Sequence, residues 1–80
     1  MHKLPAITGK DLIKFLESIG FKVIRIKGSH VRLKNEEGKA TTVPLHGSEA
    51  LPKGLLRKII REDLEMSLEE FLILFNNFKS

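Results

Sequence analysis

The chain is 80 residues long, with 41% hydrophobic residues, 30% charged residues and no cysteine. This length fits a single domain, residues 1–80, and the apolar fraction argues against disorder. The absence of cysteine excludes disulfide scaffolds, thiol nucleophiles and cysteine-based zinc sites, and it fits a reducing cytoplasm. No stretch approaches the ~20 apolar residues that a membrane-spanning helix needs. We therefore expect a cytoplasmic protein that does not enter a membrane.

The net charge of +4 is unevenly distributed along the chain. No acidic residue lies between Glu17 and Glu36, and the basic residues of that interval are Lys22, Arg25, Lys27, Arg32 and Lys34. A second basic cluster consists of Lys53, Arg57, Lys58 and Arg61. Two such clusters suit a polyanion, because cations that neutralise phosphates release counterions and thereby drive binding. The alternative is ordinary solvated charge with no partner.

The first predicted element is a helix over residues 8–19. Thr8 and Asp11 have the spacing of a capping box, in which a hydroxyl at the N-cap is followed by an acidic residue three positions later. Apolar residues then recur at helical spacing, and Gly20 can end the helix because it adopts the left-handed conformation without a Cβ penalty.

Three strands are predicted over residues 21–27, 29–34 and 39–45. The intervening turns, at Gly28 and at 35–38, are short enough to force antiparallel neighbours. From Ser29 to Lys34, polar and apolar residues alternate, so that His30, Arg32 and Lys34 share one exposed face. We expect both main helices on the opposite face.

Two more helices are predicted, over residues 52–64 and 68–77. The second begins with another capping box, formed by Ser67 and Glu70. Its seven apolar residues between Leu68 and Phe78 form a wider face than one core contact requires, which predicts an interface, either a homodimer or a partner protein. The fold class is α+β, with the order α-β-β-β-α and an extra C-terminal helix.

Few residues are suited to catalysis. The three histidines, His2, His30 and His46, have no metal-binding spacing, and the sequence contains neither a nucleophile elbow nor a phosphate-binding loop of nucleotide hydrolases. His30 lies in the most basic segment. Histidine transfers protons near neutral pH, and RNA supplies its own nucleophile, the 2′-OH, so a histidine flanked by cations is enough for RNA cleavage. The alternative is an exposed histidine without a function.

Several blocks of the sequence resemble the HicA family of toxins from bacterial and archaeal toxin–antitoxin pairs. The matching segments, in chain order, are Gly9-Lys10-Asp11-Leu12 with Leu16, Gly20-Phe21, Lys27-Gly28-Ser29-His30, Val43-Pro44-Leu45-His46, and Lys53-Gly54 with Leu56-Arg57-Lys58-Ile59. The resemblance covers about residues 4–64, which is most of the chain. The order and intervals of these blocks make the resemblance more specific than the Gly-Ser-His triplet alone.

The resemblance implies a double-stranded-RNA-binding-domain-like fold and an endoribonuclease that cleaves mRNA until a HicB antitoxin covers it. It implies that His30 is catalytic, without a metal or other cofactor. The expected RNA contacts are Lys27, Gly28, Ser29, Arg32, Lys34, His46, Lys53, Arg57 and Lys58. The other functions left open are a non-catalytic module for structured RNA and a protein–protein adaptor acting through residues 68–78.

Overall fold

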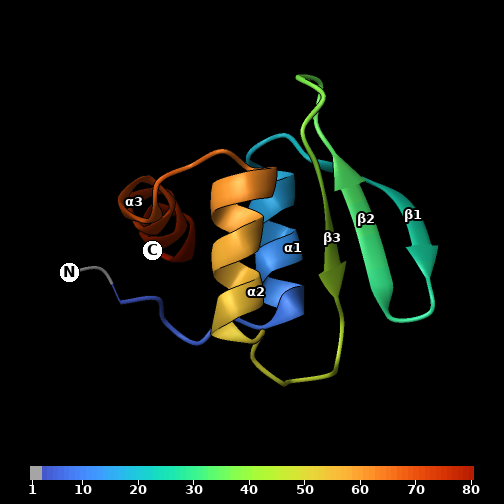
Figure 1. Ribbon diagram of the computed structural model, residues 1–80, viewed down its shortest axis with the longest axis horizontal. Helices are drawn as coiled ribbons and strands as arrows, with labels where there is room; N and C mark the ends of the chain where they lie inside the picture. Colours follow the sequence, from blue (N-terminus) through green and yellow to red (C-terminus); the bar gives the residue numbers. More distant parts are fainter. Residues whose placement is uncertain (1–2) are drawn as a thin grey trace.

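The computed structural model describes residues 3–80 and consists of a three-stranded sheet, two helices on one of its faces and a third helix beyond them (Figure 1). The elements are α1 (Gly9–Ser18), β1 (Lys22–Lys27), β2 (His30–Lys34), β3 (Ala40–Pro44), α2 (Lys53–Lys58), a π-helical segment (Ile59–Asp63) and α3 (Leu68–Lys79). The predicted α+β class, the element order and the extra C-terminal helix are confirmed. Among the described residues, no helix is long and apolar enough to cross a membrane.

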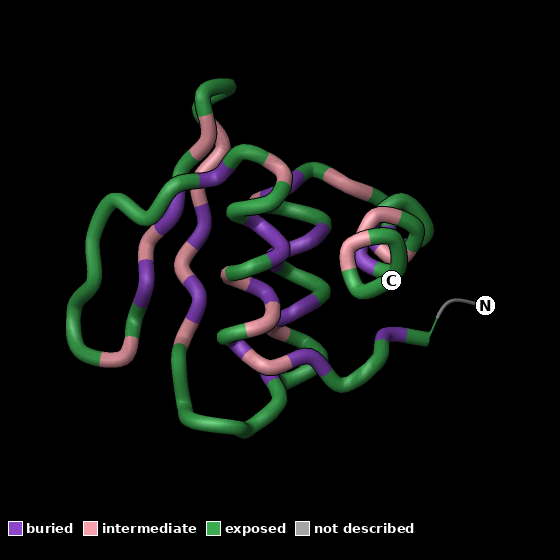
Figure 2. Tube along the Cα trace, turned by 180° about the vertical axis from the view of Figure 1, so that it is seen from behind, coloured by how far each residue is buried: buried purple, intermediate pink, exposed green. Residues whose placement is uncertain are grey.

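The sheet is antiparallel in the order β1-β2-β3, as the two short turns predicted. Val31 and Leu33 of β2 are buried beneath the helices. The alternate residues His30, Arg32 and Lys34 point to the open face. The pairing of β1 with β2 is irregular between Val23 and Arg25, which explains why the alternation along β1 was imperfect in the sequence. β1 is exposed along its whole length (Figure 2).

The helix starts follow the predicted capping pattern. Thr8 Oγ1 accepts a hydrogen bond from the backbone N–H of Asp11 at 3.1 Å, and Ser67 Oγ accepts one from Glu70 at 3.0 Å. Gly20 follows the end of α1 with a φ of 102°, a conformation that favours glycine. These features could be predicted from the sequence because each depends on only a few neighbouring residues.

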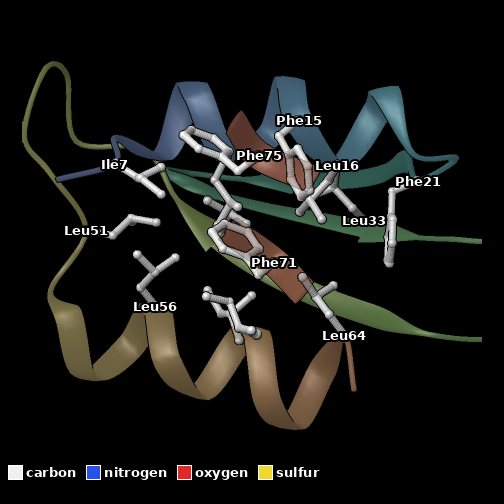
Figure 3. Close-up of a cluster of buried hydrophobic side chains, with 14 of the residues drawn as sticks. Ile7, Phe15, Leu16, Phe21, Leu33, Leu51, Leu56, Leu64, Phe71 and Phe75 are labelled. Atoms are coloured by element: carbon white, nitrogen blue, oxygen red, sulfur yellow. The ribbon is translucent and has the colours of Figure 1, made fainter. Parts of the chain in front are cut away.

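The core lies between the sheet and the helices, and Phe15 of α1 is one of its fully buried members (Figure 3). Phe15 is 0% exposed, and its ring meets those of Phe71, Phe75 and Phe78 edge-on, at centroid distances of 5.2, 5.5 and 5.7 Å. Edge-to-face contacts of this kind stabilise a core beyond simple area burial. They attach α3 to α1.

One predicted helix, over residues 52–64, is not a regular α-helix. α2 ends at Lys58 and continues as the π-helical turn, in which the Leu64 N–H donates to the Ile59 carbonyl at 2.9 Å. A π-helical turn takes up one residue more than an α-helical turn. In this turn Asp63 reaches the buried Thr41 of β3, whose hydroxyl donates to Asp63 Oδ2 at 2.8 Å. That contact joins residues far apart in the sequence, so periodicity could not indicate it.

The breadth of the apolar face on α3 has an explanation within the chain. Leu68, Phe71 and Phe75 are buried, and Leu72, Leu74 and Phe78 are partly buried against the core. Only Ile73, at 57% exposure, points to solvent among the seven. Much of this apolar face is therefore used within the chain, where α3 packs against α1 and the π-helical turn. The interface expected at this helix stays a prediction.

Gly9 leaves no room for a side chain where α1 meets the end of β3. A Cβ at this position would overlap the Pro44 carbonyl oxygen, a backbone atom that cannot move aside easily. We expect Gly9→Ala to lower the free energy of unfolding by about 1–3 kcal/mol through overpacking. The control is Gly54→Ala in α2, where nothing lies within 4 Å. There, alanine should raise stability by about 0.5–1 kcal/mol. Denaturant unfolding measures both, and equal effects would contradict the Gly9 contact.

Candidate active site

His30 lies at the first position of the central strand, directly after a two-residue turn. Gly28 and Ser29 form this turn between Lys27 and His30, which pair across the two strands. Gly28 has a φ of 59°, as the first central residue of a type II′ hairpin turn requires. The turn therefore fixes the register that sends His30 to the open face of the sheet, where it is exposed.

The His30 side chain lines an open depression on this face. The residues around it are Arg25, Lys27, Gly28, Ser29, His30, Arg32 and Thr42. They come from all three strands and from the β1–β2 turn. Three of them carry a permanent positive charge, and none is acidic. The depression thus combines one imidazole with three cations, an arrangement that can hold a phosphate next to a group able to transfer a proton.

Two cross-strand pairs at the depression place positive or protonatable groups opposite each other. Arg25 pairs with Arg32, and Lys27 pairs with His30. Like charges that face each other across strands destabilise a sheet. A bound anion between them would remove this repulsion. Neither pair includes an acidic residue, so these cross-strand pairs do not neutralise each other's charge.

Arg32 is held in place from the neighbouring strand. Its Nη1 donates a hydrogen bond to Thr42 Oγ1 at 3.0 Å, and both residues are half-buried. The two residues are direct partners in the β2–β3 ladder. Thr42 is the residue of the depression that sequence reasoning missed. Its signal was its position opposite Arg32, which becomes visible only once the register of the third strand is known.

The edge of the site near His30 is anchored by the segment that follows β3. The Leu45 N–H donates to the Ser29 carbonyl at 2.6 Å, which ties the chain after Pro44 to the β1–β2 turn. Further along, the Leu51 N–H donates to the Ile7 carbonyl at 2.8 Å. These two hydrogen bonds hold the loop that carries His46 at both of its ends, Leu45 and Leu51.

Of the residues predicted to contact RNA, the structure brings together Lys27, Gly28, Ser29, Arg32 and the predicted catalyst His30. Lys34 lies at the other end of β2, opposite Lys22 and Ala40, and does not line the depression. His46 is exposed on the loop after β3 and is likewise outside it. His2 lies outside the described residues. Within residues 3–80, no three His, Asp or Glu side chains are grouped so as to hold a metal ion.

The second basic cluster is separate from the depression. Lys53, Arg57 and Lys58 are exposed on α2, which packs on the face of the sheet opposite to His30 (Figure 1). The sequence suggested two basic clusters serving one polyanion. The structure places them on different layers of the fold, and none of the three α2 cations lines the depression.

The residues that line the depression lie within a segment that matches a known protein family. The family model described as HicA toxin of bacterial toxin-antitoxin matches residues 9–64, which include every residue that lines the depression. No curated protein sequence matches the chain. The family match covers more than half of the chain, from the start of α1 past the end of the π-helical turn. The chain therefore belongs to the HicA family, the toxins of bacterial toxin–antitoxin systems.

Proposed function

We propose that this toxin is an endoribonuclease that cleaves mRNA with His30 as its acid–base catalyst and without a metal ion. The observation that carries the proposal is the exposed imidazole within a depression lined by Arg25, Lys27 and Arg32. Membership of the HicA family supports it, because the family consists of toxins of toxin–antitoxin systems. The resemblance implies an endoribonuclease whose catalytic histidine is that of the Gly-Ser-His segment, His30 in this chain.

The chemistry needs only groups that the site and the substrate provide. The cations hold the scissile phosphate and stabilise the charge that develops on its oxygens. The 2′-OH of the RNA attacks phosphorus, and the bond from phosphorus to the 5′-oxygen breaks. His30 acts as general base on the 2′-OH or as general acid at the leaving 5′-oxygen. Water makes the other transfer: it gives a proton to the 5′-oxygen in the first case and takes the 2′-OH proton in the second. The products are a 2′,3′-cyclic phosphate and a 5′-OH.

The predicted contacts outside the depression belong to a longer stretch of RNA. Lys34 extends the basic face of the sheet beyond Arg32, and His46 lies on the loop next to the β1–β2 turn. Lys53, Arg57 and Lys58 on α2 would contact phosphates only where the RNA passes around to the helical side. RNA phosphates at successive grooves are the usual partners of such separated cations.

The partner expected from the family is a HicB-type antitoxin, which would cover the toxin in the cytoplasm. Family membership itself implies a cognate antitoxin. A homodimer through Leu68–Phe78 remains a prediction. The packing of α3 against α1 leaves only Ile73 well exposed for it among the seven apolar residues.

A non-catalytic module for structured RNA is the second candidate. The observation in its favour is that the depression contains one imidazole and no carboxylate, so phosphate binding alone would account for its cations. The deciding experiment incubates purified protein with mRNA in the presence of EDTA. Cleavage that is lost in His30→Ala supports the nuclease. Binding without cleavage by the wild type would overturn it in favour of the module.

RNA binding should depend strongly on salt. Each phosphate contact contributes roughly −0.7 to −0.9 to the slope of log K against log salt concentration. We expect Lys27→Gln to reduce the magnitude of the slope by about one such step. Lys14→Gln on the exposed surface of α1 is the control and should leave the slope unchanged. Equal slopes for all three proteins, measured by titration at several salt concentrations, would show that Lys27 is only solvated surface.

The hydrogen bond from Arg32 to Thr42 should matter for cleavage. Thr42→Val keeps the shape and the strand preference of the residue but removes the acceptor. We expect kcat/KM to fall about 2- to 10-fold, the equivalent of a net hydrogen bond of ~0.5–1.5 kcal/mol. Thr42→Ser, which keeps a hydroxyl, should recover most of the loss. If the valine and serine variants behave alike, Thr42 does not act through its oxygen.

A further inference from the structure

The depression around His30 presents groups that recognise phosphate, and its lining has no phenylalanine, tyrosine, tryptophan, asparagine or glutamine. The hydroxyls of Ser29 and Thr42 can pair with either kind of base and therefore do not select one. Its side chains are the cations Arg25, Lys27 and Arg32, the hydroxyls of Ser29 and Thr42, and the imidazole of His30. Contacts to phosphates position a protein on a nucleic acid but carry no sequence information directly. Sequence is read by base-edge hydrogen bonds, and single-stranded bases are typically held by stacking on aromatic rings.

No aromatic ring other than histidine is free to stack on a base at this site. The chain has five phenylalanines and no tryptophan or tyrosine. Phe15, Phe21, Phe71 and Phe75 are buried in the core, and Phe78 packs against it. The fold therefore uses every phenylalanine ring for packing, and leaves none of them on the open face of the sheet.

Amide side chains, which read adenine, are also remote from the site. The sequence has no glutamine and three asparagines. Asn35 lies in the turn between β2 and β3, where its Oδ1 accepts the backbone N–H groups of Glu37 and Lys39 at 3.1 and 2.8 Å. Asn76 and Asn77 belong to α3, beyond the two helices that cover the sheet (Figure 1).

The arginines are the remaining groups that can read a base, since guanine accepts two hydrogen bonds from one guanidinium. One guanidinium nitrogen of Arg32 already donates a hydrogen bond to Thr42, and Arg32 pairs with Arg25 across the strands. Two guanidiniums that face each other repel, and an anion between them removes that repulsion better than a neutral base edge does. Their arrangement favours a phosphate.

We propose that the site reads the sugar–phosphate backbone and cleaves RNA regardless of the base on either side of the scissile bond. Any flexible phosphodiester with a neighbouring 2′-OH would be a substrate, and the positions cut in a long RNA would reflect accessibility rather than sequence. This inference rests on the proposed nuclease function, and specifies its substrate class.

The test uses DNA oligonucleotides that contain one ribonucleotide, A, C, G or U, followed by either a purine or a pyrimidine. Cleavage then occurs at one defined bond, and an oligonucleotide without a 2′-OH is the blank. We expect kcat/KM to vary by less than about fivefold across the set, because one bidentate base contact would give roughly 5- to 150-fold discrimination. A preference above about fivefold, for guanine or for any other base, would overturn the inference.

A binding measurement separates this inference from the proposed function. His30→Ala, which should still bind, is titrated with single-stranded RNA 12-mers of differing base composition. Affinities that agree within about fivefold support backbone recognition, and a base-dependent affinity beyond that contradicts it. His30-dependent cleavage restricted to one base would overturn the inference and leave the nuclease intact. Failure of the wild type to cleave any oligonucleotide or mRNA would overturn the proposed nuclease, and with it the inference.

Discussion

Replacing His30 with alanine is expected to reduce the rate of RNA cleavage by ~10²–10⁴-fold, the usual contribution of one acid–base group. The fold and the RNA affinity should survive, because His30 is exposed and the cations around it remain. Cleavage rates, thermal unfolding and RNA titration of the same preparation measure the three quantities separately.

His46→Ala is the matched control for this prediction. His46 is also exposed, but it lies on the loop after β3 and outside the depression. We expect His46→Ala to change the cleavage rate by less than about tenfold, which is the effect of losing one neutral hydrogen bond. Undiminished cleavage by His30→Ala, in protein free of contaminating nuclease, would reject the assignment. Unfolding of that variant would mean that His30 has a structural role instead.

The largest expected effect on stability is that of Phe15→Ala. Phe15 is fully buried, and three aromatic rings of α3 pack edge-on against it. Truncating a buried phenylalanine typically costs about 3–5 kcal/mol, a large share of the ~5–15 kcal/mol that stabilise a domain. Denaturant unfolding should show a much lower midpoint, and α3 should lose its attachment first.

Two further variants make this prediction testable even if Phe15→Ala does not fold. Phe15→Leu retains most of the apolar volume and should unfold at an intermediate denaturant concentration. Ile73→Ala, on the exposed side of the same helix α3, should stay within about 0.5 kcal/mol of the wild type. A larger loss for Ile73→Ala than for Phe15→Leu would mean that the outer side of α3 is buried by a partner after all.

Local signals in the sequence predicted most of the fold. Caps at Thr8 and Ser67, the glycine after α1 and the alternation from Ser29 to Lys34 each depend on residues close in the chain. The π-helical turn and the burial of α3 were not predictable in this way. Both result from contacts between distant segments, those of Asp63 with Thr41 and of Phe15 with α3.

The candidate site was predictable in part for the same reason. Strand alternation indicated that His30 and Arg32 share a face, and the turn at Gly28 placed Lys27 beside them. The contribution of Thr42 required the register of β3, which no local pattern specifies. The separation of the α2 cations from the depression required knowing which face of the sheet the helix covers.

The chemistry of the new RNA ends tests the central claim most directly. RNA is cleaved by the wild-type protein in EDTA, and the termini of the fragments are identified by mass spectrometry. Attack by the 2′-OH with His30 as the proton-transfer group predicts 2′,3′-cyclic phosphate or 3′-phosphate on one side of the cut and 5′-OH on the other. His30→Ala should form these ends ~10²–10⁴-fold more slowly. Fragments that carry 3′-OH and 5′-phosphate ends would show that water, not the RNA itself, is the nucleophile, and would contradict the account.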